Sequence, residues 1–269
     1  MLVNQKTMPE KLLILGGTSE AYQLAENLDK QLPQENLNFI SSLAGSTKKP
    51  NIPAGKFRTG GFGGLTGLKN FLVQKKISLL VDATHPFAEN ISKNALLASS
   101  ELGLPILVLN RPPWAKHHND QWIEVASVEN AVKYLKNVEK KTGTLFSTGS
   151  IFLTTGNKEL WLFQKFLNYR FLVRTVEDPE LASEWPEATF LQDRGPYTLE
   201  NEVTLLEKHD ISMLVTKNSG GSSTYAKIEA ARHLKIPVLM VRRPEMITGK
   251  SCQTVNEAVE WVNLHCSHY

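Results

Sequence analysis

The sequence predicts an α/β protein made of two Rossmann-like domains with parallel sheets and an interdomain cleft. Short apolar runs alternate with helical patterns along the chain, which is typical of βαβ units. In addition, LGLPILVLNRP at Leu102–Pro112 returns as LKIPVLMVRRP at Leu234–Pro244, so one strand-loop-helix-strand plan occurs twice. The proline-containing stretch Arg111–Asp120 has no periodicity and reads as a linker. We therefore predict one domain over residues 1–112 and a second over residues 113–269.

Each predicted strand is a short apolar run, and each predicted helix has apolar residues at helical spacing. In the first half, the predicted elements in chain order are strand Lys11–Leu15, helix Ser19–Leu28, strands Leu37–Leu43 and Lys56–Thr59, helix Leu65–Gln74, strand Leu79–Val81, helix Ala88–Leu102 and strand Ile106–Leu109. In the second half they are helix Val128–Val138, strand Thr144–Ser147, helix Lys158–Leu167, strands Phe171–Val176 and Thr189–Gln192, helix Leu199–His209, strand Met213–Thr216, helix Thr224–Leu234, strand Val238–Val241 and helix Asn256–Leu264.

The composition is that of an ordinary globular protein, with 41% hydrophobic and 21% charged residues among 269. A formal charge of +3 is too small to indicate nucleic acid as a partner, although a local basic lining for an acidic small molecule fits it. The two cysteines, Cys252 and Cys266, predict no disulfide framework and suit a reducing cytosol. Since neither a signal peptide nor an apolar run of about 20 residues occurs, we expect a soluble cytoplasmic protein with no membrane partner.

The first glycine loop, Gly16-Gly17-Thr18-Ser19, joins an apolar strand directly to a helix. Glycines allow a sharp turn and close approach of a phosphate, and the helix N-terminus supplies N–H donors. The loop is a variant of the dinucleotide fingerprint G-x-G-x-x-G, because Gly16, Thr18 and Ala21 stand at the glycine positions. We predict a pyrophosphate site here; the alternative is a tight turn with Ser19 as the helix N-cap.

The second strand indicates which dinucleotide is bound. NAD-binding folds place an acidic residue near its end for the ribose 2′-hydroxyl. Here the segment from Ile40 to Lys49 contains hydroxyls and lysines but no acid. This pattern favours NADPH, with NADH as the less suited cofactor, and places Ser42, Gly45 and Lys48 near the adenosine. Alternatively, Lys48 only solvates a loop.

Two further loops belong to the same predicted sheet edge. The run Gly60-Gly61-Phe62-Gly63-Gly64 enters a helix, and so many glycines predict close passage of a ligand at Gly61 or a flexible turn. Asp82, Thr84 and His85 follow the fourth strand. There Thr84 can contact the cofactor, and Asp82 or His85 can orient a ligand or deliver a proton; otherwise Asp82 and Thr84 cap the next helix.

Candidate anion-binding residues lie at strand ends in both halves. They are Thr155 before a predicted helix, Lys217, Ser219 and Gly220 in the loop after Met213–Thr216, and Arg111 and Arg243 beside prolines. Guanidinium groups can clamp carboxylates bidentately, or can pair with an acidic neighbour in the protein. No metal site is predicted, since His117-His118 and the His-containing tail lack partners at metal-ligand spacing.

Taken in order, these motifs resemble the precorrin-6A reductase family of cobalamin biosynthesis. The resemblance extends from Leu13 to Pro244. The matching segments are Gly16–Ala21, Ser42–Gly45, Gly60–Gly64, Asp82–Ala88, Arg111-Pro112 with Trp114, Thr155-Gly156, Gly195–Tyr197, Lys217–Gly221 with Lys227, and Arg243-Pro244. Tyr197 departs from the Phe expected after Gly-Pro.

The resemblance implies an NADP-dependent oxidoreductase that reduces a C=C bond in the macrocycle of precorrin-6A, or its cobalt-bearing counterpart, to the 6B form. It implies an anionic tetrapyrrole between the two domains. We expect the first domain to bind the cofactor, and Lys217, Ser219, Arg111 and Arg243 to anchor the substrate carboxylates. We expect a monomer or a small homo-oligomer. The alternatives are another NADP-dependent oxidoreductase or epimerase, against which the missing Tyr-x-x-x-Lys pair counts, and a non-catalytic two-lobed binding module for an anionic ligand.

Overall fold

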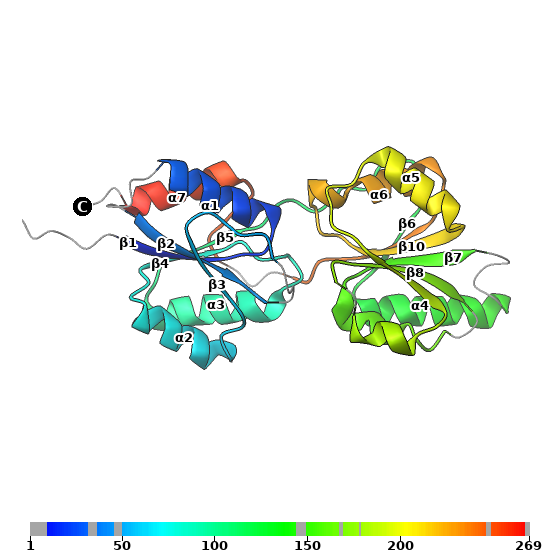
Figure 1. The fold of residues 1–269 in the computed structure, drawn as a ribbon, viewed down its shortest axis with the longest axis horizontal. Coiled ribbons are helices and arrows are strands. Elements are labelled where there is room, and N and C mark those ends of the chain that lie inside the picture. The colour runs from blue at the N-terminus through cyan, green and yellow to red at the C-terminus, as the bar shows by residue number, and fades with distance from the viewer. Residues whose placement is uncertain are drawn as a thin grey trace, which may run out of the picture. The chain divides into compact units, whose positions relative to one another are not determined.

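The computed structural model describes residues 10–31, 37–45, 50–143, 149–166, 169–177, 179–245 and 249–266. The chain divides into two compact units: unit 1 comprises Met1–Pro112 and Glu245–Tyr269, and unit 2 comprises Pro113–Pro244. Each unit contains a six-stranded sheet whose strands are parallel and whose faces are covered by helices (Figure 1). The predicted class, α/β with two Rossmann-like domains, is confirmed; the cleft between them stays a prediction.

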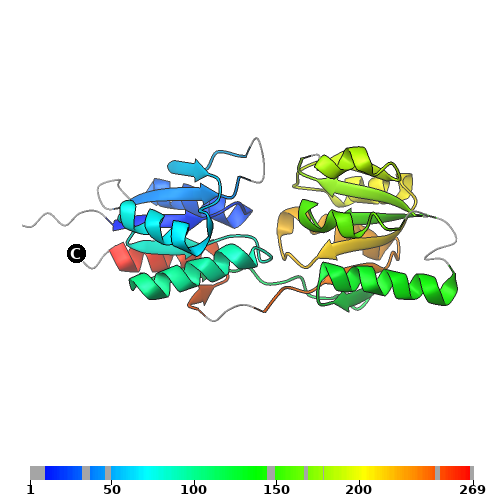
Figure 2. The same ribbon diagram turned by 90° about the horizontal axis from the view of Figure 1, so that it is seen from below.

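Unit 1 has the strand order β12-β5-β4-β1-β2-β3. Its helices α1 and α7 pack together on one face, and α2 and α3 pack together on the other (Figures 1 and 2). In chain order its elements are β1 (Glu10–Leu15), α1 (Ser19–Gln31), β2 (Leu37–Leu43), β3 (Lys56–Thr59), α2 (Gly64–Gln74), β4 (Leu79–Asp82), α3 (Glu89–Leu102), β5 (Ile106–Leu109), β12 (Ser251–Cys252) and α7 (Val255–Cys266).

Unit 2 has the strand order β6-β11-β10-β7-β8-β9, with α5 and α6 on one face and α4 on the other (Figure 1). Its elements are β6 (Trp122–Val125), α4 (Val128–Thr142), β7 (Ser150–Thr154), β8 (Arg170–Thr175), β9 (Ala188–Gln192), α5 (Leu199–Lys208), β10 (Ile211–Lys217), α6 (Ala226–His233) and β11 (Val238–Val241), with 3-10 helices η1 (Asn157–Leu162), η2 (Glu180–Glu184) and η3 (Ser222–Thr224).

Both faces of the central strands are buried, which explains their continuous apolar sequences. On β1, Leu12 and Ile14 join the core beneath α1 and α7, whereas Leu13 and Leu15 join the core beneath α2 and α3. Successive side chains of a strand point to opposite faces, so an alternating pattern would leave one face without a core. Among the described residues, no helix is long and apolar enough to cross a membrane.

The predicted second domain, 113–269, is wrong in its extent, because residues 245–269 belong to unit 1. Strand β12 follows β11 of unit 2 in the chain but pairs with β5 of unit 1. Conversely, β6 follows β5 of unit 1 but pairs with β11 of unit 2. Each unit therefore receives its sixth strand and the following helix from the segment that leaves the other unit. The red helix α7 lies with the blue elements of unit 1 in Figure 1.

This exchange leaves a trace in the sequence beyond the repeat described above. VENAVKYL at Val128–Leu135 begins α4, and VNEAVEWV at Val255–Val262 begins α7. Both helices are capped alike, because Ser127 Oγ accepts from the Asn130 amide and Thr254 Oγ1 from the Glu257 amide, each at 3.2 Å. The repeat therefore extends past each Arg-Pro sequence, into β6 and α4 after Pro112 and into β12 and α7 after Pro244.

Other differences concern unit 2. The predicted strand Thr144–Ser147 lies outside the described residues, and the strand β7 occupies Ser150–Thr154, between two glycine-containing loops, where no strand is predicted. The predicted helix Lys158–Leu167 is the short 3-10 helix η1. Strands β6 and β12, of four and two residues, are not predicted from the sequence, and the two residues of β12 are too few to show periodicity.

Trp261 and Leu264 on α7 test whether the C-terminal helix is part of the core of unit 1. Trp261 is 5% exposed among the unit 1 core residues, whereas Leu264 is 61% exposed. We expect Trp261→Ala to lower the free energy of unfolding by about 3–5 kcal/mol and Leu264→Ala to change it by less than about 0.5 kcal/mol. Chemical denaturation measures both, and equal losses would contradict the assignment.

Candidate functional site

The candidate cofactor site lies at the carboxyl ends of the strands of unit 1. The strand order reverses between β1 and β4, since β2 lies on one side of β1 and β4 on the other. Open parallel sheets bind nucleotides at such a switch point. The loop Gly16–Ser19 leaves β1 and the segment Ala83–His85 leaves β4, so the two predicted loops meet at this place.

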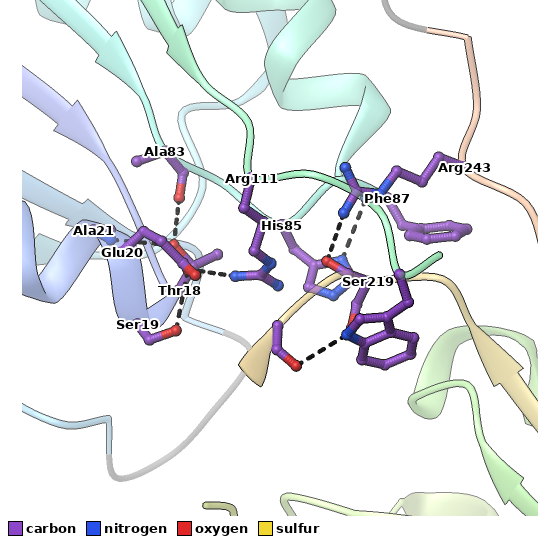
Figure 3. Close-up of polar contacts among 12 residues, drawn as sticks. Thr18, Ser19, Glu20, Ala21, Ala83, His85, Phe87, Arg111, Ser219 and Arg243 are labelled. Carbon is purple, nitrogen blue, oxygen red and sulfur yellow. Dashed lines mark hydrogen bonds and ion pairs between the residues drawn. The ribbon is translucent and has the colours of Figure 1, made fainter. Parts of the chain in front are cut away.

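Thr18 joins the two loops. Its side chain is 8% exposed; its Oγ1 donates to the Ala83 carbonyl at 2.8 Å and accepts from the Ala21 amide at 3.2 Å (Figure 3). The second bond makes Thr18 the N-cap of α1. The alternative of Ser19 as the cap is wrong, because the Ser19 hydroxyl donates to Glu20 Oε2 at 3.1 Å instead. Thr18 is thus committed to positioning the loop.

The two glycines of this loop have different roles. The Gly16 amide donates to the Ser42 carbonyl at 2.9 Å, and a Cβ on Gly16 would meet Ala21 Cβ at 3.2 Å. A side chain at Gly16 would therefore press against Ala21 at the start of α1. Gly17 has φ +112°, and no atom would lie within 4 Å of its Cβ, so its backbone is open to a ligand. A shallow hollow with no room for an enclosed water molecule adjoins both glycines, lined also by Ala21, Tyr22, Ser41, Leu43 and Pro53.

Arg58 lies at the predicted adenosine end, and the sequence patterns assign no role to it. Arg58 donates to Ser42 Oγ at 2.7 Å and to the Gly61 carbonyl at 3.1 Å, and its guanidinium lies 4.2 Å from the Phe62 ring centroid. Partial burial lowers the pKa of Arg58. The sequence signal that could have found Arg58 is its place directly before a glycine run, near the end of a strand. Lys48 lies outside the described residues.

Gly45 and the run Gly60–Gly64 complete this edge. Gly45 has φ +76°, and a Cβ there would meet the Gly60 backbone at 3.1 Å, so the two loops touch. In contrast, Gly61, Gly63 and Gly64 have open space at the Cβ position. The N-terminus of α2 at Gly63 has no side-chain cap. Its amide donors are therefore available to an anion.

Asp82 and Thr84 form a closed turn after β4. Asp82 is 1% exposed, and its Oδ1 accepts from the Thr84 amide at 3.1 Å and from Thr84 Oγ1 at 2.7 Å. Its Oδ2 is buried and has no hydrogen-bond partner among the described residues. His85 Nδ1 accepts from the Phe87 amide at 3.3 Å. These bonds explain the conformation of the turn, and the proton-donor role of Asp82 or His85 stays a prediction.

The predicted cations at strand ends have partners within their own units. Arg111 forms an ion pair with Glu20 of α1 (Figure 3). In unit 2, Lys217 Nζ lies 3.0 Å from Glu159 Oε2, and Arg243 donates to the carbonyls of Asn218 and Ser219 at 2.9 and 2.8 Å. The alternative of an acidic neighbour therefore describes Arg111 and Lys217.

The loop after β10 is held by Trp114 of the predicted linker. The Trp114 amide donates to Asn218 Oδ1 at 2.7 Å, and Asn218 Nδ2 donates back to the Trp114 carbonyl at 3.1 Å. Its indole donates to the Gly221 carbonyl at 3.3 Å. Gly220 of this loop has φ +71°. Thr155 is buried at the end of β7, and its Oγ1 has no partner among the described residues. The substrate roles of Thr155, Ser219 and Gly220 stay predictions.

A buried charge cluster of Arg174, Glu202 and Lys227 lies in unit 2. Of the three, only Lys227 is among the segments that carry the family resemblance, where it has no assigned role. Arg174 on β8 donates to both carboxylate oxygens of Glu202 on α5, at 2.6 and 3.1 Å, and stacks 4.0 Å from the Tyr197 ring. Lys227 on α6 is 6% exposed, with Nζ 5.2 Å from the Trp114 ring centroid. Burial lowers the pKa of Lys227 to about 7.

These features define the class: an α/β protein with two Rossmann-like units, one of which presents a glycine loop at its switch point. The model of the precorrin-6x reductase CbiJ/CobK family matches residues 11–263, so the chain belongs to that family.

Relatives agree along the whole chain. It is 39% identical over 255 residues to "Precorrin-6A reductase" of Rhodococcus erythropolis, covering 94% of this chain and 97% of the relative. It is 28% identical over 261 residues to "Cobalt-precorrin-6A reductase" of Priestia megaterium, covering 92% and 96%. Among solved structures it resembles "CobK precorrin-6A reductase", with a TM-score of 0.85, 34% identity, and coverage of 95% and 97%. The family resemblance drawn from the motifs is confirmed.

Lys227→Met tests the burial of the ammonium. The folded-state pKa near 7 lies below the ordinary 10.5, so between these values the unfolded chain binds more protons and wild-type stability rises with pH. Below pH 7 Lys227 is protonated in the folded protein, so the full cost of burying its ammonium lowers the stability of the wild type. We expect Lys227→Met to gain roughly 1–3 kcal/mol of unfolding free energy at pH 6 and less at pH 9.

Denaturant titrations at pH 6 and pH 9 measure this gain. Lys208→Met, at an exposed position of α5, is the matched control and should change the unfolding free energy by less than about 0.5 kcal/mol at either pH. A Lys227→Met variant that is destabilised equally at both pH values contradicts the burial.

Proposed function

We propose that the protein catalyses the NADPH-dependent reduction of a C=C bond in precorrin-6A, or in its cobalt-bearing form, to the 6B product of cobalamin biosynthesis. The observation that carries the proposal is the family match over residues 11–263, which includes both candidate sheet edges. Relatives named for either form of the substrate cover more than nine-tenths of this chain. We assign the cofactor to unit 1 and the tetrapyrrole to unit 2.

The residues of unit 1 fit a dinucleotide. Gly17 leaves open the space that a Cβ would fill, and it stands directly before the N-terminus of α1, whose amides suit a pyrophosphate. Gly61, Gly63 and Gly64 leave similar space beside the end of β2. The nicotinamide supplies the hydride when it is bound.

NADPH is favoured over NADH by the charges near β2. The described part of its carboxyl end, Ser41–Gly45, contains no carboxylate to bind a ribose 2′-hydroxyl. Arg58 lies at the adjacent end of β3 and holds Ser42, which supports a 2′-phosphate at this place. We assign Ser42, Gly45, Lys48 and Arg58 to this end of the cofactor.

The chain's own residues position the reactants. Thr18 fixes the glycine loop to β4 through the Ala83 carbonyl, so the pyrophosphate site and the turn at Asp82 and Thr84 keep one geometry. Precise alignment of two rings and exclusion of water are the main protein contributions to hydride transfer. We assign proton delivery to His85 or to solvent. Asp82 holds the turn through Thr84.

NADPH oxidation in the presence of precorrin-6A is the direct test of the function. We expect loss of NADPH absorbance together with the spectral shift of the corrinoid, in equal amounts, because one hydride reduces one double bond. A chain that binds precorrin-6A without oxidising NADPH is a binding module. A chain that oxidises NADPH only with another substrate belongs to a different class of oxidoreductase.

Gly17→Ala tests the cofactor loop, with Gly103→Ala as the matched control. Both glycines have positive φ, +112° and +64°, and open space at the Cβ position, but Gly103 ends α3 away from the loop. Both substitutions cost backbone strain of order 1–3 kcal/mol. We expect Gly17→Ala alone to weaken NADPH binding, by about tenfold or more, in a fluorescence titration. Equal affinities of the two variants would place the cofactor elsewhere.

A further inference from the structure

Lys227 is the unusual cation of unit 2. Arg174 is bound to Glu202, Lys217 to Glu159, and Arg243 to two backbone carbonyls. Lys227 is as buried as Arg174, at 6% and 8% exposure, yet it makes no hydrogen bond or ion pair with any described residue. Its polar environment consists of the Trp114 ring at 5.2 Å and the charges of Arg174 and Glu202.

A buried ammonium without a partner is destabilising, and its neighbours do not compensate it. Both oxygens of Glu202 are already taken by Arg174 at 2.6 and 3.1 Å. The cluster therefore has one more positive charge than negative charge whenever Lys227 is protonated. Proteins keep buried charges where they are paired or bind a ligand, so the missing anion is expected from outside the chain.

Lys227 lies near the sheet edge that carries the predicted substrate loop. Lys227 lies in the first turn of α6, and side chains of a helix point toward its N-terminus, here the segment that follows the loop Lys217–Gly221. Trp114, whose ring faces the Lys227 ammonium, is hydrogen-bonded to Asn218 and Gly221 of that loop.

Further unpartnered donors lie at this edge. Thr216, near the end of β10, pairs in register with Thr154 and so lies on the sheet face that carries Arg174, whereas Thr155 and Thr175 point to the opposite face. The hydroxyls of Thr155, Thr175 and Thr216 are fully enclosed and have no partner among the described residues. Lys227 Nζ does not belong to that enclosed set, so it keeps some access from outside. An ammonium that makes no ion pair with a described residue, beside this sheet edge, suits a carboxylate.

We propose that Lys227 is the carboxylate-binding cation of unit 2, and that it takes an acetate or propionate group of the anionic tetrapyrrole. The identity of the ligand rests on the proposed function, whereas the anion site rests on the geometry of unit 2. Lys217 and Arg243, which are already bound within the protein, hold the loop that lies beside it.

The test measures the Kd of precorrin-6A without NADPH, and the KM and kcat with NADPH, for wild type, Lys227→Met, Lys227→Arg and the exposed control Lys208→Met. We expect Lys227→Met to raise Kd and KM about tenfold or more. Lys227→Arg keeps the charge and should stay within about threefold, and Lys208→Met should equal wild type. An unchanged melting temperature or a higher one shows that Lys227→Met is folded.

A pH series adds a readout that a structural role would not change. The charged and titratable groups around Lys227 are Arg174 on β8, Glu202 on α5, Tyr197 before α5 and Tyr225 before α6. With its pKa near 7, Lys227 loses its proton as pH rises, so wild-type Kd should increase by roughly tenfold per pH unit between pH 7 and pH 9. Lys227→Arg should show a flat profile, because arginine stays protonated.

The outcomes separate the two proposals. If Lys227→Met weakens precorrin-6A binding but the wild type oxidises no NADPH, the anion site stands and the proposed reaction fails. If the wild type reduces precorrin-6A while Lys227→Met keeps its Kd and KM and the pH profiles of wild type and Lys227→Arg coincide, the anion site is overturned and the reaction stands. A wild type that does not bind precorrin-6A overturns both.

Discussion

The parallel pairing of every strand is the constraint on which the candidate sites depend. In each unit the six strands run in one direction, so all their carboxyl ends meet at one edge of the sheet. In unit 1 this edge gathers the glycine loop after β1, the turn after β4 and the glycine run after β3. A single buried hydroxyl, that of Thr18, then fixes two of these loops to each other through the Ala83 carbonyl and the Ala21 amide. In unit 2 the same constraint gathers the loop after β10 and the buried threonines.

Each unit is completed by a strand that comes directly after the other unit in the chain: β6 in unit 2 and β12 in unit 1. The chain leaves unit 1 after Pro112, builds β6 to β11, and returns at Glu245 to complete unit 1 with β12 and α7. Trp261 and Val262 of α7 are core residues of unit 1, so unit 1 is incomplete until the C-terminus has been made. The two Arg-Pro sequences that end the repeated segments stand at the two crossings.

Much of unit 1 could be predicted from the sequence because its elements follow short-range rules. The predicted bounds of β2, β3 and β5 agree with the observed ones, and the loop from Gly16 to Ser19 lies where the strand and helix patterns required. The predictions that were wrong or missing concern elements whose partners are distant in sequence. The return of residues 245–269 to unit 1 is decided by the open edge beside β5, and β12 is too short to show periodicity.

The sequence also does not show which cations of the candidate anion site are paired within the protein. Sequence position at strand ends selected Lys217, Arg111 and Arg243, and each of them has a partner that no local pattern indicates. Lys227 sits within a helical pattern, and apart from the family resemblance nothing near it in the sequence distinguishes it from a solvated lysine of an exposed face. Only the packing of α6 against α5 and Trp114 shows that its ammonium is buried without a hydrogen bond to a described residue.

We propose that unit 1 holds the nucleotide and unit 2 holds the tetrapyrrole. Hydrogen–deuterium exchange of the whole protein with NADP⁺ alone tests it most directly. We expect slower exchange in peptides that contain Gly16–Ala21 and Gly60–Gly64, and unchanged exchange in peptides that contain Lys217–Lys227. Protection of Lys217–Lys227 by NADP⁺, with no change at Gly16–Ala21, would contradict it.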